Sequence, residues 1–240
     1  VGFPLLAIIQ AFGFWIGMGA ASNISRYLGR RCVHKAGVLA STAVLMAFGT
    51  GVAIMLSGML FNKGIVSFLG ATDTILPYAQ QYSHVIFWGA PLTCASFVSN
   101  NILRSQRRAF FAMIGIVSGS VLNLGLDPLF IFTLDMGIQG AALSTVLCQA
   151  ISFGFMGTAL VRRDSLVKLG ARYISRIPGV YLLILSTGLP SLFRQGCQCA
   201  ATILLNRAGA AYGDAAVAAM SIVGKVSFLF SSLIVGFGKG

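Results

Sequence analysis

The sequence predicts an all-α fold, a polytopic bundle of helices in a membrane. Hydrophobic residues make up 57% of the chain and charged residues 9%, whereas soluble domains are roughly a quarter charged. The 240 residues have a mean hydropathy of +0.87. The apolar residues fall into runs of about 20, the length that an α-helix needs to cross the hydrocarbon core.

The apolar runs predict seven helices, each ended by charged or turn-forming residues. Basic segments follow the first, third and fifth runs, and segments with Gly, Asn or Asp follow the second, fourth and sixth. The predicted helices are residues 1–21, 36–60, 78–103, 109–134, 137–161, 181–206 and 215–238. Because residue 1 already lies in an apolar run, we expect the chain to begin inside a helix.

The sixth predicted helix contains Gly188-Leu-Pro190, and a proline removes one backbone hydrogen bond from a helix. One interpretation is a single kinked span. The other is an amphipathic surface helix before Gly188, with the true span starting at Pro190. The second is favoured, because it leaves Arg194 only about 10 Å from the cytoplasmic end at 1.5 Å per residue.

Basic residues mark one side of the predicted bundle. The alternate loops 22–35, 104–108 and 162–178 together carry twelve Lys and Arg residues, and the other loops carry only Lys63 and Arg207. Cytoplasmic loops have an excess of Lys and Arg, so we expect the three basic loops to be cytoplasmic in a multi-pass cell-membrane protein. This placement gives the net charge of +12 a topological explanation, so we expect a lipid bilayer as the partner and no nucleic acid. The first helix then runs inward, which is explained most simply by one helix missing upstream.

Asp127 is the one acidic residue inside a long apolar run. It ends Asn123-Leu-Gly-Leu-Asp127, and a spacing of four places both side chains on one helix face. Pro128 has no N–H, which frees the carbonyl of Leu124 beside them. These oxygens predict a site for a monovalent cation such as Na⁺, or a proton acceptor. The alternative is a structural carboxylate that neighbouring helices cap.

Three more polar side chains lie inside predicted helices. Thr145 supplies a hydroxyl ligand if its helix face meets Asp127. Lys225 lies mid-span, so we expect it to face a hydrated cavity or a carboxylate, whereas Arg194 is expected to be an interfacial anchor.

Catalytic motifs are missing from the sequence. It has no paired-aspartate motif for diphosphate, no His-Glu-x-x-His, no nucleophile elbow and no phosphate loop. The five cysteines show no paired-ligand spacing and are interpreted as packing residues. The sequence therefore predicts neither an enzyme nor a cofactor.

Several segments together resemble the MATE (multidrug and toxic compound extrusion) family of transporters. They cover the end of the first helix, the turn after the third, and landmarks of the second half. The most specific is the run from Leu122 through Asp127-Pro128 to Ser144-Thr145. The resembling segments are 17–29, 103–113, 122–145, 188–190 and 236–240.

The resemblance covers essentially all of the chain and implies helices two to eight of a twelve-helix transporter. It implies an N-terminal six-helix lobe over residues 1–161 without its first helix, a cytoplasmic connector over 162–180, and the first two helices of a C-terminal lobe over 181–240. The last four helices of that lobe would be missing. A transporter of this family is expected to be a monomer when full length.

Site residues follow from the same resemblance. Many members hold the coupling cation with an aspartate of helix one, an Asn and an Asp of helix five and a Thr of helix six. Asn123, Asp127 and Thr145 match the last three, and the helix-one aspartate would lie before residue 1. Some branches use an acidic residue in helix seven, where this chain has Gln198. Because Gln198 carries no charge, the resemblance favours a coupling-cation site in the N-terminal lobe and not in the C-terminal lobe.

These inferences lead to one main hypothesis and two rivals. The main hypothesis is a Na⁺- or H⁺-coupled antiporter that exports cationic drugs or toxic organic compounds, with Lys225, Gln198 and Arg194 as candidates for the substrate path. A lipid-linked saccharide flippase of related architecture would line its cavity with several Arg and Lys, and only Arg194 and Lys225 are available. A non-transporting membrane scaffold is the third alternative.

Overall fold

The computed structural model describes residues 2–68, 76–133, 136–161, 170, 173, 178–210, 223 and 230. Every element over these residues is helical, which confirms the predicted all-α fold. The chain divides into two compact units, Val1–Phe193 and Arg194–Gly240. Lys225 and most of the predicted connector 162–178 lie outside the described residues, and the lobe boundaries stay predictions.

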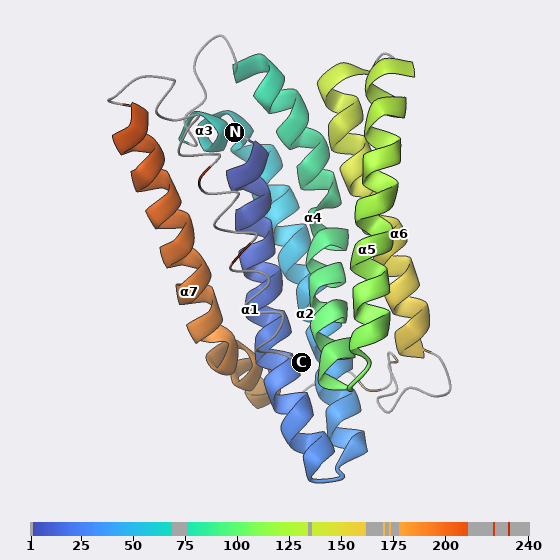
Figure 1. The fold of residues 1–240 in the computed structure, drawn as a ribbon. Helices are drawn as coiled ribbons and strands as arrows, with labels where there is room; N and C mark the ends of the chain where they lie inside the picture. Colours follow the sequence, from blue (N-terminus) through green and yellow to red (C-terminus); the bar gives the residue numbers. More distant parts are fainter. Residues whose placement is uncertain are drawn as a thin grey trace. The chain divides into compact units, whose positions relative to one another are not determined.

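The helices follow the apolar runs of the sequence closely from the second run to the fifth. Figure 1 shows their arrangement. Their bounds are α1 Gly2–Gly29, α2 Val33–Leu60, α3 Asn62–Phe68, α4 Leu76–Ser105, α5 Ala109–Pro128, the π-helix η1 Leu129–Thr133, α6 Gly137–Val161 and α7 Pro178–Ala210.

Two helix predictions near the start of the chain were wrong. The first helix continues through Ser22 and Arg26 to Gly29, so the loop predicted at 22–35 is only the short turn before α2. The reason is packing, since Ile24 is fully buried and Asn23 is 4% exposed. Residues 62–68, predicted as a connector, form the short helix α3.

The favoured interpretation of the sixth helix was also wrong. α7 is one α-helix through Gly188 and Pro190, with no surface helix before them. Neighbouring side chains bond to the turn before the proline: the indole Nε1 of Trp15 donates to the carbonyl of Leu185 at 2.9 Å, and Asn23 Nδ2 donates to Thr187 Oγ1 at 3.1 Å. Helices in membranes tolerate proline where such neighbours stabilise the interrupted turn.

α4 is the central helix of the Val1–Phe193 unit. It contacts α1, α2, α3, α5 and α6, and its buried polar side chains are Ser83, Thr93, Ser96, Ser99, Asn100 and Asn101. Of the described helices, those long and apolar enough to cross a membrane are α1, α2, α5 with η1, and α6. The polar residues are therefore concentrated on the helix that other helices surround.

Small residues let the helices approach closely in this unit. α2 buries Ala36, Ala40, Ala43 and Ala47 on one face, and Gly51 continues it. Side chains of this size allow helix backbones to come into van der Waals contact. The turn between α1 and α2 and the turn between α4 and α5 lie at the same end of the unit (Figure 1), and the side of the membrane that they face stays a prediction.

Gly51 provides a test of the packing between α2 and α4. An added Cβ there would collide with the backbone of Pro91. Gly51→Ala is expected to destabilise the protein by about 1–3 kcal/mol through over-packing, which thermal unfolding in detergent would measure. Gly49→Ala is the matched control on the same helix, because its Cβ would meet nothing within 4 Å. Equal unfolding temperatures for the two variants would contradict this packing.

Candidate cation-binding site

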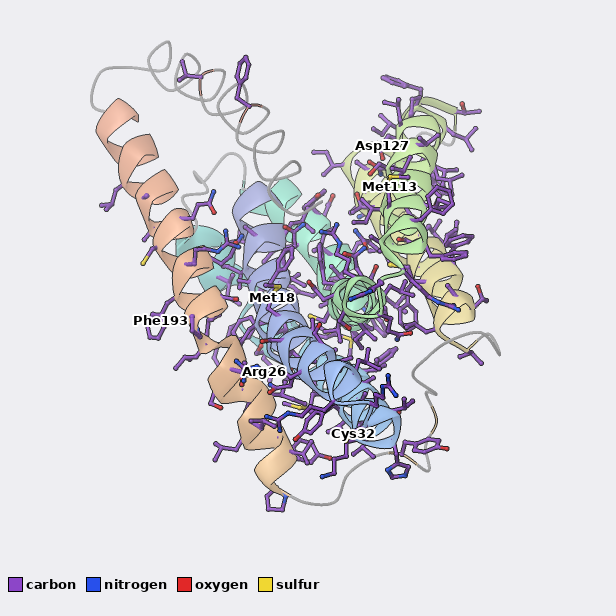
Figure 2. The ribbon with its side chains drawn as sticks, turned by 60° about the horizontal axis from the view of Figure 1, so that its bottom comes forward. Met18, Arg26, Cys32, Met113, Asp127 and Phe193 are labelled. Atoms are coloured by element: carbon purple, nitrogen blue, oxygen red, sulfur yellow. The ribbon has the colours of Figure 1, made fainter. Side chains whose placement is uncertain are left out.

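Asp127 lies in the last turn of α5, where α5 and α6 run side by side (Figure 1 and Figure 2). Asn123 is one turn earlier on the same face, and its Nδ2 donates to Asp127 Oδ1 at 3.0 Å. Both side chains are half-buried. The predicted pairing of Asn123 with Asp127 is therefore present.

The start of α6 brings a second donor to the carboxylate. Gly137 begins this helix with φ +54°, a conformation that suits glycine. A Cβ on Gly140 would collide with the carbonyl of Phe130, so α6 packs closely on η1. This approach places Ser144, which is fully buried, against the carboxylate, and its hydroxyl donates to Asp127 Oδ1.

Ser144 is the residue that sequence reasoning missed. Its Oγ also lies 2.9 Å from the carbonyl of Ala141 and 3.4 Å from Asn123 Nδ2. Thr145 instead donates to Ala141 at 2.9 Å and makes no hydrogen bond to Asp127 in the described structure. Consecutive residues point about 100° apart on a helix, so the phase of α6 decides which hydroxyl reaches the carboxylate. Ser144 stands beside Thr145 in the sequence, but spacing alone does not fix that phase.

Asp127 has neutral partners. Within the part of the chain that the structure describes, its hydrogen bonds come from Asn123 and Ser144, and no Lys or Arg pairs with it. Among the same described residues, no three or more His, Cys, Asp or Glu side chains lie together in a group that could hold a metal ion. One carboxylate among amide and hydroxyl groups is a donor set for a single monovalent cation or a proton, and not for a tightly held divalent metal.

The backbone changes helical type directly after Asp127. Pro128 ends α5, and residues Leu129–Thr133 form the π-helix η1. The N–H of Leu129 bonds to the carbonyl of Leu126. The lost proline donor thus coincides with a local change in helix geometry, a feature that is frequent at functional sites.

A cavity of about 180 Å³ lies between α4, α5 and α6, next to the carboxylate cluster. Asn123 and Thr145 both line it, so the structure brings Thr145 into the same space as Asn123. The other lining residues are Ser96, Phe97, Asn100, Ile116, Gly119, Ser120, Cys148, Gln149, Ser152 and Met156.

Three predicted site residues lie elsewhere in the chain. Arg194 and Gln198 are exposed on the part of α7 that belongs to the Arg194–Gly240 unit. Lys225 lies outside the described residues. The roles predicted for these three side chains stay predictions.

Comparison with known proteins identifies the family. The family model MatE matches residues 1–129. The chain belongs to the MatE family. This confirms the resemblance to multidrug transporters, and with it a multi-pass membrane protein.

Curated relatives support the same family assignment. The chain is 26% identical over 237 residues to "Multidrug export protein MepA" of Staphylococcus saprophyticus, covering 99% of this chain and 52% of that protein. It is equally similar to the MepA protein of Staphylococcus aureus strain MRSA252. The chain thus spans about half the length of the curated relatives it matches.

Solved MatE structures share the fold. The outward-facing conformation of a multidrug resistance MATE family transporter of the MOP superfamily matches with a TM-score of 0.90 and 30% identity, covering 99% of this chain and 53% of that one. The inward-facing conformation of such a transporter matches with a TM-score of 0.85 and 31% identity, covering 95% and 52%.

Ser144→Ala and Thr145→Val separate the two neighbouring hydroxyls. Without ligand cation, in choline buffer, Ser144→Ala is expected to destabilise the protein by about 1–3 kcal/mol, because a half-buried carboxylate loses a donor. Thr145→Val is expected to change stability by less, because its hydroxyl bonds only to its own helix. Thermal unfolding of both variants measures the difference. A larger loss of stability in Thr145→Val than in Ser144→Ala would contradict the assignment of Ser144 as the donor to the carboxylate.

Proposed function

We propose that this chain is the ion-binding part of a cation-coupled antiporter that exports cationic drugs or toxic organic compounds across the cytoplasmic membrane. Inward movement of Na⁺ or H⁺ would drive the export. The observation that carries the proposal is the carboxylate of Asp127, which lies in an apolar segment and has only neutral partners among the described residues.

The energetic argument concerns the negative charge of Asp127. A carboxylate at membrane depth is unfavourable unless a partner charge compensates it. Asn123 and Ser144 donate hydrogen bonds but bring no positive charge. A bound cation or proton supplies the missing charge, so occupancy of the site changes the stability of this packing of α5 and α6.

Coupling then follows from differential affinity. A ligand shifts a conformational equilibrium only by the ratio of its affinities for the two states. In the proposed cycle, the packing that brings Ser144 and Asn123 to Asp127 is one state, and the cation-bound packing is the other. Thr145 lines the same space and is proposed as a further cation ligand.

The substrate class comes from the relatives and not from this site. The relatives are named as multidrug export proteins, and the coupling of export to cation entry favours cationic compounds. Arg194, Gln198 and Lys225 are proposed as candidates for the substrate path. The protein is proposed to act as a monomer in the lipid bilayer, with its basic loops in the cytoplasm.

Asp127→Asn tests the proposal, because it removes the charge and keeps the size of the side chain. The protein encoded by the complete reading frame is reconstituted, and ethidium efflux is measured with a Na⁺ gradient and a pH gradient imposed separately. One gradient is expected to drive efflux, and Asp127→Asn is expected to reduce the driven rate roughly tenfold or more. Asp164→Asn, in the basic connector of the sequence, is the control for loss of one acidic residue.

Three other outcomes of this experiment would each contradict a different part of the proposal. Normal gradient-driven efflux in Asp127→Asn would refute the coupling role. No efflux of dye under either gradient, with transport of a lipid-linked saccharide, would favour the flippase. A protein that moves neither substrate in liposomes would favour the scaffold.

A further inference from the structure

The turns that follow α1 and α4 have the same backbone hydrogen bonds. After α1, the N–H of Arg31 bonds to the carbonyl three residues earlier at 3.0 Å, and the N–H of Cys32 bonds to the carbonyl five residues earlier at 2.9 Å. After α4, the N–H groups of Arg107 and Arg108 make the equivalent bonds at 3.1 Å and 3.0 Å. This pattern is the Schellman motif, which ends a helix with one residue in the left-handed conformation.

Arginine occupies the left-handed position in both turns. Arg31 has φ 59° and Arg107 has φ 61°, and they are the two non-glycine residues with positive φ in the described part of the chain. Glycine is the usual residue there, because a Cβ makes this conformation unfavourable. A disfavoured residue at the same position of two turns indicates that its side chain has a role.

The positive charge of the two turns has no acidic partner among the described residues. The side chains of Arg31 and Arg107 are exposed, and segments 22–35 and 104–108 carry seven Lys or Arg residues and no Asp or Glu. Asp127 is the one acidic residue that the structure describes. It lies at the other end of α5, about 27 Å along the helix at 1.5 Å per residue. An anion for these turns must therefore come from outside the described chain.

Arg108 shows how an arginine of the same turn is used inside the protein. Its guanidinium donates to the carbonyl of Ala159 at 3.3 Å and lies 5.8 Å from the centre of the Phe111 ring. It thereby connects the start of α5 to the end of α6. Its neighbour Arg107 is exposed, so of these two arginines Arg107 is the one available to an external partner.

A third basic segment contacts the first half of α2. The N–H of Gly170 donates to Ser41 Oγ at 3.3 Å, and the ring of Tyr173 lies 5.6 Å from the ring of His34 in an edge-to-face arrangement. Gly170 and Tyr173 belong to segment 162–178, which has five Lys or Arg residues and one Asp. Part of this segment is thus held on the helix that follows the first turn, which adds to the need for an anion there.

Helix length places the turns at the level of the lipid headgroups. α1 has 28 residues and α4 has 30, so their lengths are about 42 Å and 45 Å at 1.5 Å per residue. The hydrocarbon core of a bilayer is about 30 Å thick, and about 40–45 Å with its headgroup regions. A helix of this length that crosses the membrane ends in the layer of the lipid phosphates.

We propose that the two turns form a binding surface for anionic phospholipids, in which the guanidinium groups of Arg31 and Arg107 bind lipid phosphates. A guanidinium group binds phosphate through two parallel hydrogen bonds, and anionic lipids attract Lys and Arg clustered beside membrane helices. The lipid contact explains why arginine stands where glycine would suit the backbone better. This surface is separate from Asp127 and does not depend on the proposed cation coupling.

Thermal unfolding of the protein encoded by the complete reading frame measures the binding. The purified protein is kept in dodecyl maltoside with choline chloride, and phosphatidylglycerol or phosphatidylcholine is added to the micelles. Phosphatidylglycerol is expected to raise the unfolding temperature saturably, and phosphatidylcholine to raise it less. Arg31→Gly and Arg107→Gly are each expected to raise the half-saturating phosphatidylglycerol fraction about fivefold, the effect of one basic residue at a membrane surface.

The choice of glycine separates a lipid role of the arginines from a structural one. Because glycine suits the left-handed position, both glycine variants are expected to unfold at or above the wild-type temperature without phosphatidylglycerol. Arg31→Lys and Arg107→Lys keep the charge and are expected to respond within about twofold of the wild type. Lys63→Ala removes a basic residue from α3, at the other end of the unit (Figure 1), and is expected to respond as the wild type does.

The lipid and the variant controls each give a result that would overturn the inference. Equal stabilisation by phosphatidylcholine would show that charge is not recognised, and equal stabilisation by inorganic phosphate alone would show a site for free anions. A fivefold weaker response in Lys63→Ala would show an effect of net charge only. Glycine variants that unfold earlier than the wild type without phosphatidylglycerol would show that the arginines are structural. Asp127→Asn is expected to leave the lipid response unchanged, so a failure of the proposed coupling would not affect this test.

Discussion

The arrangement of this bundle depends on one constraint, that polar groups inside a membrane must find their partners within the protein. α4 carries the largest group of such buried polar side chains. Its buried Ser, Thr and Asn side chains lie on the helix that α1, α2, α5 and α6 contact. Asn100 shows the principle most clearly, since its amide bonds to the carbonyl of Ala112 and also approaches the sulfur of Met156. One polar side chain on α4 thereby connects α5 and α6.

The same constraint makes Asp127 informative. Basic residues are numerous in this chain, yet the structure places those of the described turns at the end of the helices and none beside the carboxylate. A buried carboxylate without a compensating positive charge is costly. Two neutral donors bring no positive charge to Asp127, and this is the basis of the proposed cation site.

The sequence predicted the features that depend on local spacing. The apolar runs gave four of the helices to within a few residues, and the four-residue spacing placed Asn123 beside Asp127. The predictions that failed depended on tertiary packing. Burial of Ile24 extends α1, contacts from Trp15 and Asn23 support the proline turn of α7, and the close approach of Gly140 to Phe130 sets the phase that selects Ser144. No pattern within one helix contains that information.

The proposed coupling requires a site that responds to a small movement between helices. Asp127 and Asn123 belong to α5, Ser144 belongs to α6, and the π-helix η1 lies directly between Asp127 and the start of α6. A shift of α6 along η1 would move Ser144 away from the carboxylate, and it would break no ion pair of Asp127 among the described residues. The loss of that one donor makes the anionic site less stable and raises its affinity for a cation. The joint between α5 and α6 is therefore the place where a change of helix packing would become a change of ion affinity.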